Sequence, residues 1–121
     1  MKQQQPAFRV ERLNDVAVVH VSGDVDLHDA RQLDEAMHEA ITGGPCETLL
    51  ISFIETRYVD TTCLGLLVKV SREQGQKLRL VVPAESPMRR LLTTTGLIRA
   101  LTVHDDFSGA FAAAAARNAV L

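Results

Sequence analysis

An acid, two hydroxyls and a thiol follow one another near the middle of the chain, in the segment Val59-Asp60-Thr61-Thr62-Cys63-Leu64-Gly65. The segment lies between an apolar run typical of a buried strand and a helical pattern that opens after Asp60. The two threonine hydroxyls therefore belong to a helix N-terminus, where free backbone N–H groups and the helix dipole favour an anion. A phosphate on Thr61 or Thr62 is compatible with this position. The alternative is that Asp60 or Thr61 only caps the helix, because Asp and Thr are preferred cap residues.

Cys63, in the same segment, has two interpretations. A helix N-terminus lowers the pKa of a thiol, which is compatible with a redox role. A free cysteine is also commonly a small, buried packing residue, and we prefer this second interpretation.

No other set of residues matches a known catalytic or metal-binding pattern. The four histidines, at positions 20, 28, 38 and 104, show no ligand spacing with one another or with the two cysteines. The sequence contains no glycine-rich phosphate loop and no Gly-x-Ser-x-Gly motif. We therefore predict a protein that is not an enzyme and that has no cofactor and no metal site.

Composition restricts the partners and the compartment. Thirteen basic residues against 15 acidic ones give a net charge of −2, which argues against nucleic-acid binding by bulk electrostatics. No apolar run approaches the length of about 18 residues that a transmembrane helix needs, so we predict no membrane insertion. The N-terminus lacks the apolar run of a secretory signal, and two cysteines do not make a disulfide framework. We expect a cytoplasmic protein.

Alternating strands and helices must position the hydroxyl-bearing loop. Short alternating or β-branched apolar segments predict strands over residues 8–11, 16–21, 48–53, 77–82 and 101–103, the first two joined as a hairpin by Asn14-Asp15. Helical spacing predicts helices over 30–41 and 63–74, a third from Ser86-Pro87 to Gly96, and a last one after Asp105-Asp106. The order ββαβαβαβα predicts one α/β domain, residues 1–121, with a mixed, mostly parallel sheet flanked by helices. We expect residues 1–7 to form a ragged N-terminus.

The predicted third helix carries both apolar and basic residues. Met88 and Leu91 are assigned to the face that packs on the sheet, because one face of the helix must be buried. The adjacent pair Arg89-Arg90 is interpreted as a solvated helix face rather than a phosphate site.

Three stretches of the chain, in order, resemble the STAS domain family, and in particular the bacterial anti-sigma factor antagonists. They are Gly23-Asp24-Val25-Asp26 with the helix after it, the strand and loop from Leu49 to Gly65, and the segment from Thr95-Gly96-Leu97 to Val103-His104-Asp105. Together they span about residues 8–116. The resemblance implies a STAS fold, which agrees with the element order above.

For function, the resemblance implies a phosphorylation-dependent partner switch. Members of the family bind an anti-sigma factor that is also a protein kinase of the histidine-kinase-like ATPase type, and this binding releases a sigma factor. The kinase phosphorylates the hydroxyl that follows the loop acid, and a serine/threonine phosphatase resets it. By position, this hydroxyl belongs to Thr61, and Thr62 fills the second hydroxyl position. The family more often has Ser at the position of Thr61 and Gly at that of Cys63.

Residues around the loop are the candidate docking surface for such a partner. We predict partner binding by Asp24, Asp26, Tyr58, Asp60, Thr61, Thr62 and Cys63, and Arg57 is a further candidate. The alternative for Asp24, Asp26, Arg57 and Tyr58 is a solvated loop residue.

Two other functions stay open. One is a non-enzymatic accessory STAS subunit of a lipid-transport ABC complex or of a stress-signalling assembly, which the family also contains. The other is a small ligand-binding module that uses the loop as an anion site.

Overall fold

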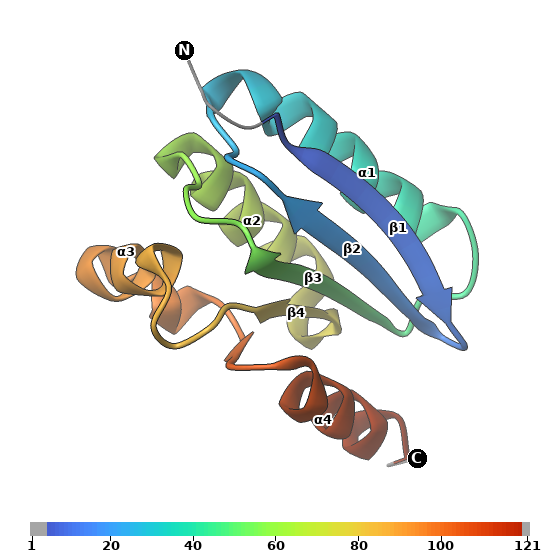
Figure 1. Cartoon of the computed structure of the whole chain (residues 1–121). Coiled ribbons are helices and arrows are strands. Elements are labelled where there is room, and N and C mark those ends of the chain that lie inside the picture. The colour runs from blue at the N-terminus through green and yellow to red at the C-terminus, as the bar shows by residue number, and fades with distance from the viewer. Residues whose placement is uncertain (1–4, 120–121) are drawn as a thin grey trace.

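One mixed sheet organises the part of the chain that the computed structural model describes, residues 5–119. Its strands are β1 (Ala7–Leu13), β2 (Val16–Ser22), β3 (Thr48–Glu55), β4 (Leu78–Val81) and β5 (Val103–His104), and they lie side by side in that order. β1 runs antiparallel to β2, whereas all later neighbours are parallel (Figure 1). The predicted element order and the mixed, mostly parallel sheet are confirmed.

A two-residue turn joins β1 and β2, as predicted. Leu13 pairs with Val16, and Asn14 between them has a φ of 59°. Asn tolerates this left-handed conformation, and a turn of two residues fixes the register of the strands beyond it. The register places Arg9 opposite His20 and Val10 opposite Val19.

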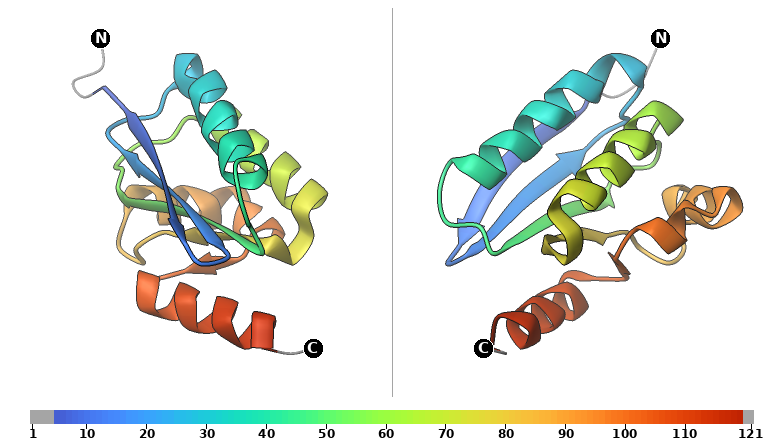
Figure 2. Two further views of the ribbon diagram at one scale, coloured as in Figure 1. Left: turned by 90° about the vertical axis from the view of Figure 1, so that its right-hand side faces the viewer. Right: turned by 180° about the vertical axis from the view of Figure 1, so that it is seen from behind.

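The helices divide between the two faces of the sheet. Helices α1 (Ala30–Thr42) and α2 (Thr61–Gln74) cover one face, and α4 (Phe107–Ala119) packs on the other (Figure 2). Helix α3 (Pro87–Thr95) contributes Met88 and Leu92 to the same core as α1 and α2. Right-handed crossovers that step in one direction along a sheet place their helices on one face, so only the helix after the last strand is free to cover the other.

Strand β2 supplies side chains to two apolar cores. Ala17 and Val19 face the large core beneath α1 and α2, whereas Val16 and Val18 face a smaller core that contains Ala110 of α4. Residues 48–53 of β3 are buried on both faces, which explains the continuous apolar run of the sequence.

Some local details were not predicted. Short 3₁₀ segments form at Leu27–Asp29, Gly75–Lys77 and Leu97–Ala100. The last strand is Val103–His104 rather than 101–103, because its pairing with β4 begins only at Val103, opposite Leu80. Of the predicted ragged start, residues 1–4 lie outside the described part, and Ala7 already belongs to β1. No helix within residues 5–119 combines the length and the apolar character needed to span a membrane.

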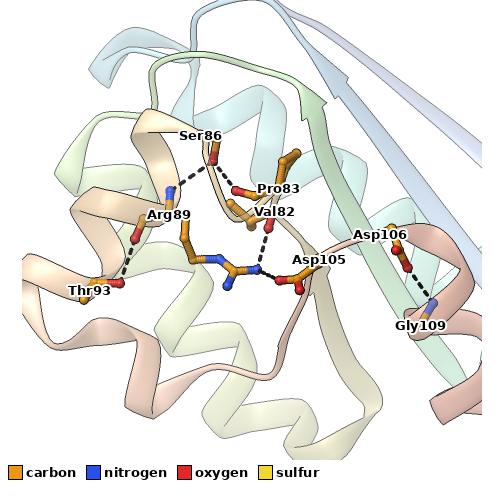
Figure 3. A network of polar contacts seen from close by, with 8 residues as sticks. All are labelled: Val82, Pro83, Ser86, Arg89, Thr93, Asp105, Asp106 and Gly109. Atoms are coloured by element: carbon orange, nitrogen blue, oxygen red, sulfur yellow. Dashed lines mark hydrogen bonds and ion pairs between the residues drawn. The ribbon is translucent and has the colours of Figure 1, made fainter.

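The prediction that Arg89 and Arg90 both form a solvated helix face is wrong for Arg89. Its side chain is only 18% exposed, and Nη2 donates to the carbonyl of Val82 at 2.6 Å and to Oδ1 of Asp105 at 2.7 Å (Figure 3). Arg90 is exposed, as expected. Arg89 therefore ties α3 to the end of β4 and to the segment after β5.

The apolar face of α3 is shifted slightly from its predicted position. Met88 is buried as predicted, whereas Leu91 is only partly buried and the adjacent Leu92 is fully buried.

Candidate functional site

Two loops that are distant in sequence form one surface at the C-terminal ends of β2 and β3 (Figure 1). Val25, before α1, and Val59, before α2, form an isolated parallel bridge. The N–H of Val25 donates to the carbonyl of Tyr58 at 2.9 Å, and the N–H of Asp60 donates to the carbonyl of Val25 at 2.8 Å. Both valines are buried, so the bridge holds the acidic β2–α1 loop beside the hydroxyl-bearing loop.

Asp60 caps helix α2. Its backbone is extended, and Oδ2 accepts a hydrogen bond from the N–H of Thr62 at 2.8 Å. This bond lowers the pKa of the Asp60 carboxyl, and the Thr62 and Tyr58 side chains beside it act in the same direction. The carboxylate is therefore ionised at neutral pH, next to the two threonines.

The two threonines of the loop are in different environments. Both side chains are exposed. The Thr62 side chain lies beside the Asp60 carboxylate, whose pKa it helps to lower. Thr61 is the first residue of α2, and its hydroxyl makes no hydrogen bond among the described residues. Capping by Asp60 thus engages Thr62 through its backbone N–H and leaves the Thr61 side chain without a partner among the described residues.

Tyr58 lies beside the cap and is 51% exposed. Its hydroxyl donates to Oδ1 of Asp60 at 3.4 Å. Partial desolvation raises the pKa of Tyr58, and the neighbouring Asp60 carboxylate raises it further. The Tyr58 side chain thus lies next to the cap of the hydroxyl-bearing loop.

Leu27 was not among the predicted site residues, yet it is 54% exposed on the β2–α1 loop. It directly follows Asp24-Val25-Asp26, so the signal available in the sequence was a leucine placed between loop acids and a helix start. A large exposed apolar side chain therefore stands on each of the two bridged loops, Leu27 on one and Tyr58 on the other.

Asp24 and Asp26 are half-buried on the β2–α1 loop. Asp26 begins the 3₁₀ segment before α1: its Oδ1 accepts from the N–H of His28 at 2.9 Å, and its own N–H donates to Oδ2 of Asp29 at 3.0 Å. This reciprocal capping box satisfies the backbone N–H groups of Asp26 and His28 with side chains of the same loop. Arg57, in the other loop, is exposed.

Cys63 lies beneath this surface. Its side chain is fully buried, and its thiol donates to the carbonyl of Asp26 at 3.5 Å. Burial raises the pKa of the thiol to about 11, and the carboxylates of Asp60, Asp29 and Asp26 act in the same direction. The packing interpretation of Cys63 agrees with its full burial, and the raised pKa disfavours the thiolate that a redox role requires. Its predicted place at the partner surface also needs correction: the buried side chain joins the two loops from below.

The assembled surface offers groups that are suited to recognition. It presents a free hydroxyl at a helix N-terminus, an ionised acid beside it, and two exposed apolar side chains. No group of three His, Cys, Asp or Glu side chains within residues 5–119 is arranged to hold a metal ion.

The fold and the loop together define a class of protein, namely small α/β domains that present a hydroxyl-bearing loop at the N-terminus of a helix. Within this class the chain belongs to the STAS domain family, because the family model described as "Mlab, STAS domain" matches residues 8–103.

Two relatives carry functional names. The anti-sigma F factor antagonist of Paenibacillus polymyxa is 27% identical over 102 residues, which cover 82% of this chain and 86% of that protein. The anti-sigma-F factor antagonist RsfB of Mycobacterium tuberculosis is 31% identical over 101 residues, which cover 79% of this chain and 82% of that protein.

Solved structures show the same fold. An anti-sigma factor antagonist from Mycobacterium paratuberculosis matches with a TM-score of 0.80 at 23% identity, over 91% of this chain and 94% of that one. The anti-sigma factor antagonist SpoIIAA in its unphosphorylated form matches with a TM-score of 0.65 at 23% identity, over 95% of this chain and all of that one. The fold predicted from the sequence is thus confirmed.

Proposed function

We propose that the chain is an anti-sigma factor antagonist. In this proposal it binds an anti-sigma factor kinase of the histidine-kinase-like ATPase type in the cytoplasm and thereby releases a sigma factor, without catalysing a reaction itself. The similarity to two proteins named as antagonists of an anti-sigma factor supports it. The observation that carries it is the unengaged hydroxyl of Thr61 on an exposed, rigidly bridged loop surface.

Thr61, rather than Thr62, is the proposed phosphoacceptor. An acceptor hydroxyl must enter the active site of the kinase, and a residue held against a neighbouring carboxylate must first leave it. Thr62 is bound to Asp60 through its backbone N–H at 2.8 Å, whereas the Thr61 side chain has no hydrogen bond among the described residues. One of the structures with the same fold is a phosphorylated form of SpoIIAA, which is the kind of modification that we propose here.

The proposed switch acts on partner affinity and leaves the fold unchanged. A phosphothreonine carries about −1.5 to −2 charges at neutral pH. At the first residue of α2 the helix dipole offsets part of the repulsion from Asp60, typically by ~0.3–1 kcal/mol at exposed positions. A docked partner has no such compensation, and a like charge facing it costs several kcal/mol. The proposed docking surface comprises Asp24, Asp26, Tyr58, Asp60, Thr61 and Thr62, and we include Leu27 because its side chain is exposed on the same loop.

The test is a paired capture from lysate of the native host with ADP present. Wild type, Thr61→Glu and Thr62→Glu serve as baits, and Thr94→Glu, an exposed threonine on α3, is the matched charge control. We expect wild type and Thr94→Glu to recover a histidine-kinase-like ATPase. Thr61→Glu should recover at least ~100-fold less, because a like charge at a docked interface costs several kcal/mol. The captured kinase with ATP should then phosphorylate wild type at Thr61, as located by mass spectrometry.

Two results would contradict the proposal. Equal recovery of the kinase by wild type and Thr61→Glu would remove Thr61 from the interface, and circular dichroism that shows an unfolded Thr61→Glu would contradict a switch that spares the fold. A phosphate found on Thr62 alone would reassign the acceptor.

An accessory subunit of a lipid-transport ABC complex or of a stress-signalling assembly is the second candidate. The description of the matching family model, "Mlab, STAS domain", supports this second candidate. In the same experiment it predicts recovery of transporter or scaffold proteins by wild type and Thr61→Glu alike.

A further inference from the structure

Strand β1 is an edge strand, and nothing within residues 5–119 pairs with its outer side. It has seven residues and runs straight from Ala7 to Leu13 along the margin of the sheet (Figure 1). An unpaired edge exposes a row of backbone N–H and C=O groups and is a template for pairing with another strand. The question is which strand fits it.

The charges of β1 are arranged around Val10 in a self-complementary way. Arg9 and Glu11 flank Val10 and point to the face of the sheet opposite α1. Their side chains are 67% and 41% exposed, and their mutual contact of 3.8 Å is long and contributes little by itself. Oε1 of Glu11 also lies 2.7 Å from Nε2 of His20, so the Arg9 guanidinium and the second carboxylate oxygen of Glu11 are the groups available to another partner.

A second copy of the same strand, antiparallel and related by a two-fold axis at Val10, satisfies these charges. In such a strand pair, the numbers of two residues that face each other sum to 20. Arg9 of each copy therefore lies opposite Glu11 of the other. The same symmetry places Val10 opposite Val10 and the exposed Leu13 opposite the exposed Ala7. Opposite charges directly across a strand pair stabilise it, and apolar pairs do so as well.

Neighbouring registers lack this match. A two-fold axis at position 9 sets Arg9 against Arg9, and one at position 11 sets Glu11 against Glu11. Like charges placed directly opposite destabilise a pair of strands. The sequence of β1 therefore selects a single symmetric register.

The other face of β1 agrees with this register. A groove between β1 and α1 is lined by Phe8, Glu35 and Glu39, of which Glu35 is paired with Arg31 at 2.9 Å. Arg12 of the second copy stands opposite Phe8 in the Val10-centred pair, and so brings a cation to the margin of an acidic groove. Within its own chain the Arg12 guanidinium is bound only by carbonyl oxygens, those of Glu39 and Pro45, among the described residues.

We propose that β1 is a homodimer interface, in which two copies of this chain pair antiparallel about Val10 and extend the sheet across the two-fold axis. The inference is independent of the antagonist function proposed above. The joint leaves the loop that bears Thr61 outside the interface, so a dimer presents two such surfaces.

Charge exchange tests the proposal. Sedimentation equilibrium of the purified full chain across the micromolar range should show a monomer–dimer equilibrium for wild type. Glu11→Arg should raise the dimer dissociation constant by roughly tenfold or more, because attraction becomes repulsion at both symmetric pairs. The double variant Arg9→Glu/Glu11→Arg should restore dimerisation, because the exchanged charges are again opposite.

The controls separate charge pairing from other effects. Glu11 also bonds to His20, with 2.7 Å between Oε1 and Nε2, and both the single and the double variant lose this bond. Rescue by the double variant therefore reports the pairing alone. Glu73→Arg, an exposed reversal on α2, should sediment like wild type. A wild type that is monomeric at every concentration overturns the proposal, and so does a dimer that is insensitive to Glu11→Arg or that the double variant fails to restore.

Discussion

Helices α2 and α3 have similar N-terminal caps but present different groups at their N-termini. α2 and α3 each follow a strand, and their cap residues, Asp60 and Ser86, have nearly equal backbone angles (φ −65° and ψ 150°, against φ −74° and ψ 152°). The Ser86 hydroxyl both accepts from the N–H of Arg89 at 3.1 Å and donates to the carbonyl of Pro83 at 2.8 Å. At α2 the cap is equally well formed, yet the next residue presents a hydroxyl without a partner.

The difference lies in the residues that follow each cap. Pro87, the first residue of α3, has no side-chain donor, and Arg89 turns back to the body of the protein (Figure 3). Thr61, the first residue of α2, is exposed and carries a hydroxyl. Capping is thus a shared structural requirement, and the residue after the cap decides whether a helix N-terminus only holds the fold or also presents chemistry to a partner.

The largest effect on stability is expected from a substitution of Arg89, near the N-terminus of α3. Arg89→Ala removes the donor to the carbonyl of Val82, a fully buried residue, and the ion pair with Asp105. A buried acceptor left without its donor costs ~1–3 kcal/mol, and the ion pair adds little because Asp105 is exposed. Urea unfolding should show a loss of roughly 2 kcal/mol. Arg90→Ala, at the exposed neighbouring position, should leave the free energy of unfolding within about 0.5 kcal/mol of wild type. Equal losses for the two variants would show that the contacts of Arg89 do not stabilise the N-terminus of α3.

Alanine substitutions of Ser86 and Thr61 compare the two helix N-termini through smaller changes in the free energy of unfolding. Ser86→Ala removes a cap hydroxyl and should lower the free energy of unfolding by ~1 kcal/mol. Thr61→Ala removes a hydroxyl without a partner and should leave stability within about 0.5 kcal/mol of wild type. Chemical denaturation of both variants in one buffer measures the difference. A loss for Thr61→Ala as large as that for Ser86→Ala would mean that the Thr61 hydroxyl also serves the fold.

Most of the fold could be predicted from the sequence, because strand and helix periodicities are local signals. The apolar run of 48–53 and the cap at Asp60 are of this kind. The length of β5 and the burial of Arg89 could not be predicted, since both depend on contacts between segments that are distant in sequence, such as Arg89 with Asp105. An arginine on a short helix has no sequence feature that distinguishes a buried guanidinium from a solvated one.

The same limit applies to the candidate site. The loop acids and hydroxyls were identifiable by residue type and by their place before a helix. The bridge between Val25 and Val59 was not, because two separate loops must meet to form it. The position of Cys63 beneath the surface is a consequence of that bridge, since its thiol reaches the carbonyl of Asp26 across the two loops.

The smallest expected effect is a difference between the Asp60 and Ser86 caps in how their contribution to stability depends on pH. The Asp60 carboxylate is hydrogen-bonded in the folded state, so its pKa lies below the ordinary value of 3.8. A lowered folded pKa means that the stabilisation is fully present above pH 3.8 and is lost as the pH falls through the folded value. Asn also caps helices but does not titrate, so Asp60→Asn keeps the bond to Thr62 without the charge. The stability advantage of wild type over Asp60→Asn should therefore shrink as the pH is lowered below 3.8.

Ser86 provides the control, because its hydroxyl is neutral throughout this range. Urea unfolding at a series of acid pH values should give a difference between wild type and Ser86→Ala that does not change with pH, while the difference between wild type and Asp60→Asn declines. Other carboxyls titrate in all three proteins, and taking differences removes their common contribution. Two flat differences would mean that the carboxylate of Asp60 does not interact with the N-terminus of α2 in solution, and the two caps would then be equivalent in kind as well as in shape.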